Sequence, residues 1–332
     1  MEGIPFKRLY LDSTNRVSGS HDDFEFEFSE TLSFGKNVVA CIEGFSCPMS
    51  WYSVEDGVND QFYWYERYSL SQTTPVIQNW LHKTTIPEGF YNAISLGQAM
   101  ASAMQNESRQ YVSSTTGSSF QFNSAYNAQK NAITITLTAV AQGTAPTTYL
   151  ASFEILTDSI LGDLAWYTLA HDNSIQPPWF DNVATSGTIP TWSLTAPQSI
   201  NNIIGLDLQN LTSDVVEAFT RLQGGLTLGI THDTGYCDMR RIHQIMLHSS
   251  AFKFNSLAHN GVQTILKRIP VSNVTAGDMI YHDHSGNQFD HFDVSSLSLR
   301  RVRFTIKDSS GKRIRLNGGN ISFSITVFEA PL

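Results

Sequence analysis

The sequence predicts an all-β protein, a sandwich or barrel of antiparallel strands interrupted by a middle segment of a different kind. Three observations support this prediction: several strand-like runs near the N-terminus, a helical pattern further along, and strict apolar–polar alternation near the C-terminus. Alternation with a period of two sends one row of side chains to a core and the other to solvent. Both ends of the chain should therefore contribute strands to one framework.

The N-terminal part holds strand candidates at the spacing expected of a sandwich or barrel. Phe24, Phe26 and Phe28 alternate with Glu25 and Glu27, which is the pattern of a half-buried strand. The candidates together are residues 7–12, 24–28, 37–45 and 62–65. We assign residues 1–66 to the framework.

The middle of the chain, residues 67–215, reads as an insertion of mixed α/β or loop-rich character. One helix is predicted near 92–105, with Asn92 as its N-cap and an apolar stripe that includes Leu96, Met100 and Met104. Residues 120–123 and 133–137 are expected to form a hairpin. The long aromatic stretch 177–197 is typical of a functional or interfacial loop.

The β pattern returns in residues 216–332 and is clearest between Ser298 and Phe328. Three alternating runs are separated by the turn-forming stretches 308–311 and 317–320, which are rich in glycine and asparagine. This arrangement predicts an antiparallel meander one sheet thick. A second sheet must cover its apolar face.

Composition narrows the class of protein. Of 332 residues, 15% are charged and 41% are hydrophobic, which is unlike a disordered chain. We expect no membrane span, because no apolar run reaches about 18 residues, and no cleaved secretion signal, because the N-terminus lacks an apolar core. Cys41, Cys47 and Cys237 lack metal-ligand spacing and are expected to be free, buried thiols.

Charge is unevenly distributed along the chain. The net charge is −9, yet residues 240–332 hold 12 Lys and Arg against 6 Asp and Glu. A basic segment can contact nucleic acid or complement an acidic neighbouring subunit. We favour the subunit contact, because no aromatic platform is interleaved with the arginines. The residues predicted for such an interface are Glu25, Glu27, Arg300, Arg301, Arg303, Lys312, Arg313 and Arg315.

The sequence offers little support for catalysis. His282 and His284 are two apart on a predicted strand, as in a cupin metal site, but no carboxylate follows at the spacing of the third ligand. No Gly-x-Ser-x-Gly nucleophile motif occurs. We therefore expect no enzyme activity, catalytic residue, metal or cofactor, and keep a cupin-like metalloenzyme as one alternative.

A second alternative is a carbohydrate-binding or host-attachment module. Trp179, Phe180 and Trp192 lie in the inserted segment and could stack on sugar rings. Burial of a long loop is the commoner role of such side chains.

Several short stretches together resemble a known family. They include Leu9-Tyr10-Leu11-Asp12-Ser13, Pro48-Met49-Ser50-Trp51-Tyr52 with Asn59 and Phe62 after it, Ile86-Pro87-Glu88-Gly89-Phe90-Tyr91, Ile245-Met246-Leu247-His248-Ser249, Arg268-Ile269-Pro270-Val271, and residues 299–328 with Arg315-Leu316-Asn317-Gly318. The chain is similar to the minor capsid (penton) proteins of Polinton-like viruses, adintoviruses and virophages. The likeness extends over nearly the whole chain.

The resemblance implies an eight-stranded jelly-roll β-sandwich carrying an inserted outer domain. It further implies a homopentamer at the icosahedral vertex of a virion, in contact with trimers of the major capsid protein and with cement proteins. A host receptor or glycan is a possible further partner, and nucleic acid is not expected. The family supplies no catalytic residues to transfer, and the insertion contains no Arg-Gly-Asp sequence.

Overall fold

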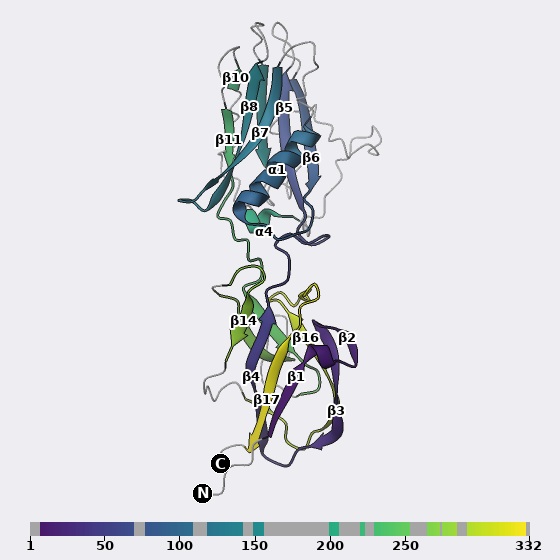
Figure 1. Cartoon of the computed structure of the whole chain (residues 1–332). Helices are drawn as coiled ribbons and strands as arrows, with labels where there is room; N and C mark the ends of the chain where they lie inside the picture. Colours follow the sequence, from purple (N-terminus) through teal and green to yellow (C-terminus); the bar gives the residue numbers. More distant parts are fainter. Residues whose placement is uncertain are drawn as a thin grey trace, which may run out of the picture. The chain divides into compact units, whose positions relative to one another are not determined.

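The computed structural model divides into two compact units, which we describe separately (Figure 1). The jelly-roll unit comprises Met1–Trp51 and Ile242–Leu332, and the inserted unit comprises Tyr52–Arg241. The structure describes residues 7–69, 77–108, 118–141, 149–155, 199–205, 220–222, 229–252, 264–272, 274–283 and 291–329. Within these ranges no helix is long and apolar enough to cross a membrane.

Two antiparallel sheets form the jelly-roll unit. The β17 sheet has the strand order β1 (Lys7–Asp12), β17 (Ser322–Glu329), β4 (Val38–Pro48) and β14 (Met279–His282), and β15 (Phe292–Asp293) also pairs with β4. The β16 sheet has the order β13 (Ile265–Pro270), β12 (Gln244–His248), β16 (Ser298–Lys307), β3 (Asp23–Ser33) and β2 (Ser18–Ser20). A short 3₁₀ turn, Ser13–Asn15, follows β1.

The strand order is that of a jelly roll. Apart from the short strands β2 and β15, the described strands of this unit in chain order are β1, β3, β4, β12, β13, β14, β16 and β17. The first, eighth, third and sixth of them form one sheet, and the second, seventh, fourth and fifth form the other. This is the double Greek key of a jelly-roll sandwich, and the predicted fold class is confirmed. The inserted unit enters between β4 and β12.

The C-terminal stretch differs from the predicted meander. β16 and β17 lie in facing sheets, and residues 313–316 form no strand beyond an isolated bridge between Lys307 and Arg313. Ile314 and Leu316 are nevertheless 1% exposed, because both side chains pack in the core of the jelly-roll unit. Alternation shows which side chains face a core. It cannot show which sheet holds the strand, because both sheets face the same core.

Aromatic side chains fill the space between the two sheets. Phe304 on β16 is fully buried, and its ring centroid lies 5.1 Å from that of Phe323 on β17 and 5.6 Å from that of Phe24 on β3. Tilted and edge-on aromatic pairs at these separations add to the free energy gained from area burial alone. Phe304 thus joins both sheets of the jelly-roll unit.

The described residues of the inserted unit form two further antiparallel sheets. One has the order β10 (Thr220–Leu222), β9 (Tyr149–Ile155), β5 (Gln61–Ser69) and β6 (Ile77–Thr85). The other has the order β11 (Gly229–Asp233), β8 (Ala132–Ala141) and β7 (Ser118–Asn127), and α4 (Asn201–Ile204) is a short additional helix. The predicted hairpin is confirmed as the pairing of β7 with β8.

Helix α1 (Ala93–Glu107) begins where the sequence predicts. The Asn92 side chain accepts a hydrogen bond from the Ser95 backbone N–H at 2.8 Å, and the Ser95 hydroxyl accepts one from the Asn92 N–H at 3.0 Å. This reciprocal capping box satisfies two backbone donors. Leu96, Met100 and Met104 are fully buried and form the face that packs on the sheet strands.

The boundaries between the two units differ from the predicted ones. The sequence predicted them at 66/67 and 215/216, and in the structure they lie at 51/52 and 241/242. The aromatic run 62–65 resembles a framework strand, but β5 pairs with β6 and β9 inside the inserted unit. Likewise, β11 pairs with β8 of the inserted unit. Strand-like sequence at the edges of an insertion is not distinguishable from the framework until its pairing partners are known.

A buried ion pair links the first and last segments of the inserted unit. Arg241 Nη2 lies 2.7 Å from Glu55 Oε2, and the two side chains are 10% and 9% exposed. Asn59 supports this turn, because its amide accepts from the Glu55 N–H and donates to the Ser53 carbonyl, both at 2.8 Å. The pair thereby joins the two points at which the chain passes into and out of the inserted unit.

Candidate assembly surfaces

Five of the predicted interface residues lie on the outer face of the β16 sheet: Glu25, Glu27, Arg300, Arg301 and Arg303. Register places Arg301 opposite Glu27 and Arg303 opposite Glu25. Glu27 accepts hydrogen bonds from Arg300 Nε at 3.1 Å and from Arg301 Nε at 2.8 Å. We call Arg300, Arg301 and Arg303 the arginine ladder. Its side chains remain 59–66% exposed although each has a carboxylate partner within the same chain.

Asp23 is a central acceptor that the sequence-based interface did not include. Arg303 Nη2 donates to Asp23 Oδ2 at 2.6 Å and Arg303 Nε donates to Asp23 Oδ1 at 2.7 Å, a bidentate arrangement. Thr305 donates to the same carboxylate at 2.9 Å. Asp23 has the parity of Glu25 and Glu27, so strand periodicity is the signal that could have found it.

Arg313 has a structural role in addition to any contact with a neighbour. It donates a short hydrogen bond to Asp22, whose side chain is only 9% exposed, and its Nη1 lies 3.5 Å from Asp23 Oδ2. Reversing its charge would place a third carboxylate beside two others. Arg313 is therefore a poor position at which to test assembly.

The other predicted interface residues lie outside the cluster around Glu27. Glu25 accepts from the Ser18 hydroxyl at 3.0 Å. Lys312 and Arg315 are exposed on the connection between β16 and β17. The structure thus brings Glu27, Arg300 and Arg301 into one cluster. The prediction that all of these residues contact another subunit stays a prediction.

The ion pairs on this face predict that acid will destabilise the jelly-roll unit. Hydrogen bonds from Arg303 hold the pKa of Asp23 below its ordinary value of 3.8 despite partial burial, and those from Arg300 and Arg301 hold the pKa of Glu27 below 4.5. A carboxylate whose pKa is lower in the folded state stabilises that state above its unfolded pKa and stops doing so as pH falls through its folded pKa.

We therefore expect the melting temperature of the jelly-roll unit to fall as pH is lowered from about 5 to below 3.8. The Arg303→Leu variant, which removes the main partner of Asp23, should show a shallower fall. Thermal melts followed by circular dichroism at a series of pH values would measure both slopes. Equal slopes in the two proteins would show that this ion pair does not cause the acid sensitivity.

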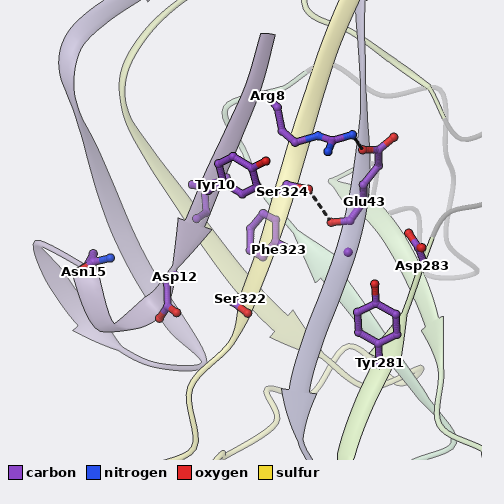
Figure 2. A pocket seen from close by; sticks show the side chains of 12 residues that line it. Arg8, Tyr10, Asp12, Asn15, Glu43, Tyr281, Asp283, Ser322, Phe323 and Ser324 are labelled. Carbon is purple, nitrogen blue, oxygen red and sulfur yellow. Dashed lines mark hydrogen bonds and ion pairs between the residues drawn. The ribbon is translucent and has the colours of Figure 1, made fainter. Parts of the chain in front are cut away.

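A groove lies on the outer face of the other sheet, the β17 sheet (Figure 2). It has a volume of about 600 Å³ and receives residues from β1, β4, β14 and β17. Tyr10 lies on β1 and Tyr281 lies on β14, the first and last strands in the order of this sheet. The two residues are 75% and 66% exposed. Between them lie the small side chains of Ser322 and Ser324.

A β-bulge in β4 helps to form the groove. Ser322 pairs with Ser46 but Ser324 pairs with Glu43, so the register shifts across Gly44. Gly44 has φ +57°, a left-handed conformation that glycine adopts without steric cost. Because Gly44 has no side chain, the floor of the groove is open at this point. A glycine inside a strand-like run is the local sequence signal for such a bulge.

Other sequence-predicted sites remain untested. Trp179, Phe180, Trp192 and His284 lie outside the described residues. His282 lies on β14 and is partly buried. Among the residues with described positions, no three His, Cys, Asp or Glu side chains are grouped to hold a metal ion.

None of the three cysteines forms a disulfide, and all three are buried, as predicted. Burial raises the pKa of the Cys47 thiol to about 12, and burial also raises the pKa of Cys237. The thiolate is the reactive form of cysteine, so these two side chains behave as packing groups at neutral pH.

The fold and surfaces define an all-β, jelly-roll protein with a second β-rich unit inserted in one connection. No protein-family model matches the chain, and no curated protein matches it. Among solved structures it is similar to the crystal structure of the mavirus penton protein. That comparison has a TM-score of 0.45 and 11% sequence identity, and it covers 98% of this chain and 99% of the mavirus chain.

Proposed function

We propose that this chain is a minor capsid protein, a penton subunit of which five copies form the vertex of an icosahedral virion. The observation that carries the proposal is the placement of the insertion. The motifs that resemble viral penton proteins imply a jelly roll with an inserted outer domain, and the chain has a jelly-roll strand order with one insertion between β4 and β12. The proposed role is assembly with other capsid subunits, without catalysis.

Assembly into a ring requires subunit surfaces that can be buried in an interface. Only 15% of the residues are charged, which keeps the cost of desolvating a large interface low. A closed ring needs a heterologous interface, in which one face of a subunit contacts a different face of the next. The two outer faces of the sandwich, one with the arginine ladder and one with the groove, suit this requirement.

The proposed partners are further copies of the chain and trimers of the major capsid protein, with cement proteins and a host receptor or glycan as additional partners in the virion. We propose that the arginine ladder, with Glu25 and Glu27 opposite it on β3, forms part of the contact between copies. The inserted unit, which carries Trp179, Phe180 and Trp192, is the proposed attachment region.

Electron microscopy of the purified full chain tests the proposal. Class averages should show discrete closed rings with five-fold symmetry. Rings of another order would contradict the vertex role, because an icosahedral vertex has five-fold symmetry. Open filaments would show a heterologous contact that does not close.

A further inference from the structure

The groove on the β17 sheet has the chemistry of a receptor for arginine side chains. Besides the two exposed tyrosines, its lining includes the carboxylates Asp12, Glu43 and Asp283 against one cation, Arg8. Tyrosine faces attract guanidinium groups through their π electrons, and carboxylates bind them through paired hydrogen bonds. Both kinds of partner are present around one depression (Figure 2).

The charges in the groove are only partly neutralised within the chain. Arg8 Nη2 lies 2.8 Å from Glu43 Oε2, and Asp12 accepts hydrogen bonds from the Thr14 N–H and hydroxyl. Asp283 has no ion-pair partner among the described residues. With three carboxylates and one guanidinium, the groove lining has a formal charge of −2.

The outer face of the opposite sheet carries the complementary excess. Its basic side chains are the arginine ladder together with Lys307 and Arg268, which both lie opposite Met246 in the register. The acidic side chains of this cluster are Asp23, Glu25 and Glu27, whereas Glu30, also on β3, pairs with Lys7 of β1 and is not counted. Five cations against three carboxylates give +2. The ladder side chains are 59–66% exposed, so they can reach a second molecule without losing their own carboxylate partners.

We propose that the groove between Tyr10 and Tyr281 receives the arginine ladder of a second copy of this chain. The contact is heterologous, because the groove and the ladder lie on the outer faces of different sheets of one sandwich. Tyrosine and arginine are enriched in the energetically dominant parts of protein interfaces. This inference rests on the proposed function and specifies which two faces meet in the ring.

Two variants, one for each face, test the pairing. The groove variant is Tyr281→Ser with Asp283→Lys, which alters exposed positions on or next to β14. The ladder variant is Arg300→Glu with Arg301→Glu, which repels the groove and spares Asp23 and Arg313. Lys36→Glu, at an exposed residue of the loop before β4, is the matched control for a charge change on the same unit. Circular dichroism melts establish that each variant is folded.

The expected result follows from the heterologous geometry. In native mass spectrometry each variant alone should lose the ring and appear at 37.0 kDa, while the Lys36→Glu control keeps the ring. An equal mixture of the two variants should give a heterodimer of two such chains, 74 kDa, because one intact groove and one intact ladder remain. The heterodimer has no second intact contact with which to close.

Different failures separate this inference from the proposed function. If the unmodified chain forms rings and a folded groove variant still forms them, the groove is not the contact between copies and the inference is wrong. Failure of the mixed variants to pair would also overturn it. An unmodified chain that forms no ring contradicts both the inference and the proposed function.

Discussion

Replacing Phe304 with alanine is expected to lower the free energy of unfolding of the jelly-roll unit by about 3–5 kcal/mol. The side chain is fully buried and touches aromatic rings from both sheets, so its removal leaves a cavity that neither sheet can close alone. Hydrogen exchange measured by mass spectrometry, peptide by peptide, resolves the effect because a two-unit chain need not unfold in one step. Peptides from β16 and β17 should lose protection.

Phe122→Ala is the matched variant for the other core. Phe122 is 5% exposed on β7, with its ring centroid 5.5 Å from that of Trp64. Its loss should deprotect α1 and β7 by a similar amount and leave β16 and β17 unchanged. If either substitution deprotected both sets of peptides equally, the two units would unfold together as one cooperative unit.

The second large effect is expected at Arg241. Replacing it with methionine should destabilise the inserted unit by about 3–5 kcal/mol, because the buried carboxylate of Glu55 would lose the cation that offsets its desolvation. Hydrogen-exchange protection of peptides from β5 and β6, measured at a series of urea concentrations, would quantify this change. The expected loss is largest where the chain enters and leaves the unit.

The adjacent Arg240 provides the control for that experiment. It pairs with Asp238 at 3.1 Å but is 43% exposed, so Arg240→Met should cost under about 1 kcal/mol. A double variant, Arg241→Met with Glu55→Leu, should recover much of the loss, because an apolar pair of similar volume can replace a buried ion pair. Equal effects of Arg240→Met and Arg241→Met would mean that burial of the Glu55 pair contributes little.

Local sequence patterns predicted the elements that depend on local physics. The strand-like run at residues 7–12 predicted β1, and Asn92 as N-cap predicted the start of α1. The pairing of β7 with β8 follows from two alternating runs that are close in sequence. These features need no knowledge of distant residues.

Features that depend on contacts between residues distant in sequence could not be predicted from local patterns. The β16 and β17 runs have the same alternation, so nothing local shows that they occupy facing sheets. The aromatic strand β5 satisfies the same pattern as a framework strand, although its partners β6 and β9 place it in the inserted unit. Sheet membership is decided by pairing.

The candidate site illustrates the same limit. Sequence identified the charged residues of the β16 face but not that Arg303 pairs with Asp23, which requires the register of β16 against β3. The groove could not be predicted, since Tyr10, Glu43, Tyr281 and Ser324 come from four strands distributed along the chain. Tyr281 and Tyr10 had no visible significance until they were placed on one face.

The native mass of the full chain tests the central proposal most directly. Measured over a tenfold range of concentration, it should be dominated by one species of five chains of 37.0 kDa each, or 185 kDa. A closed heterologous ring has no free contact, so larger species should not accumulate as concentration rises. A mass that stays at 37.0 kDa throughout, or that increases without limit, would contradict a five-copy vertex ring.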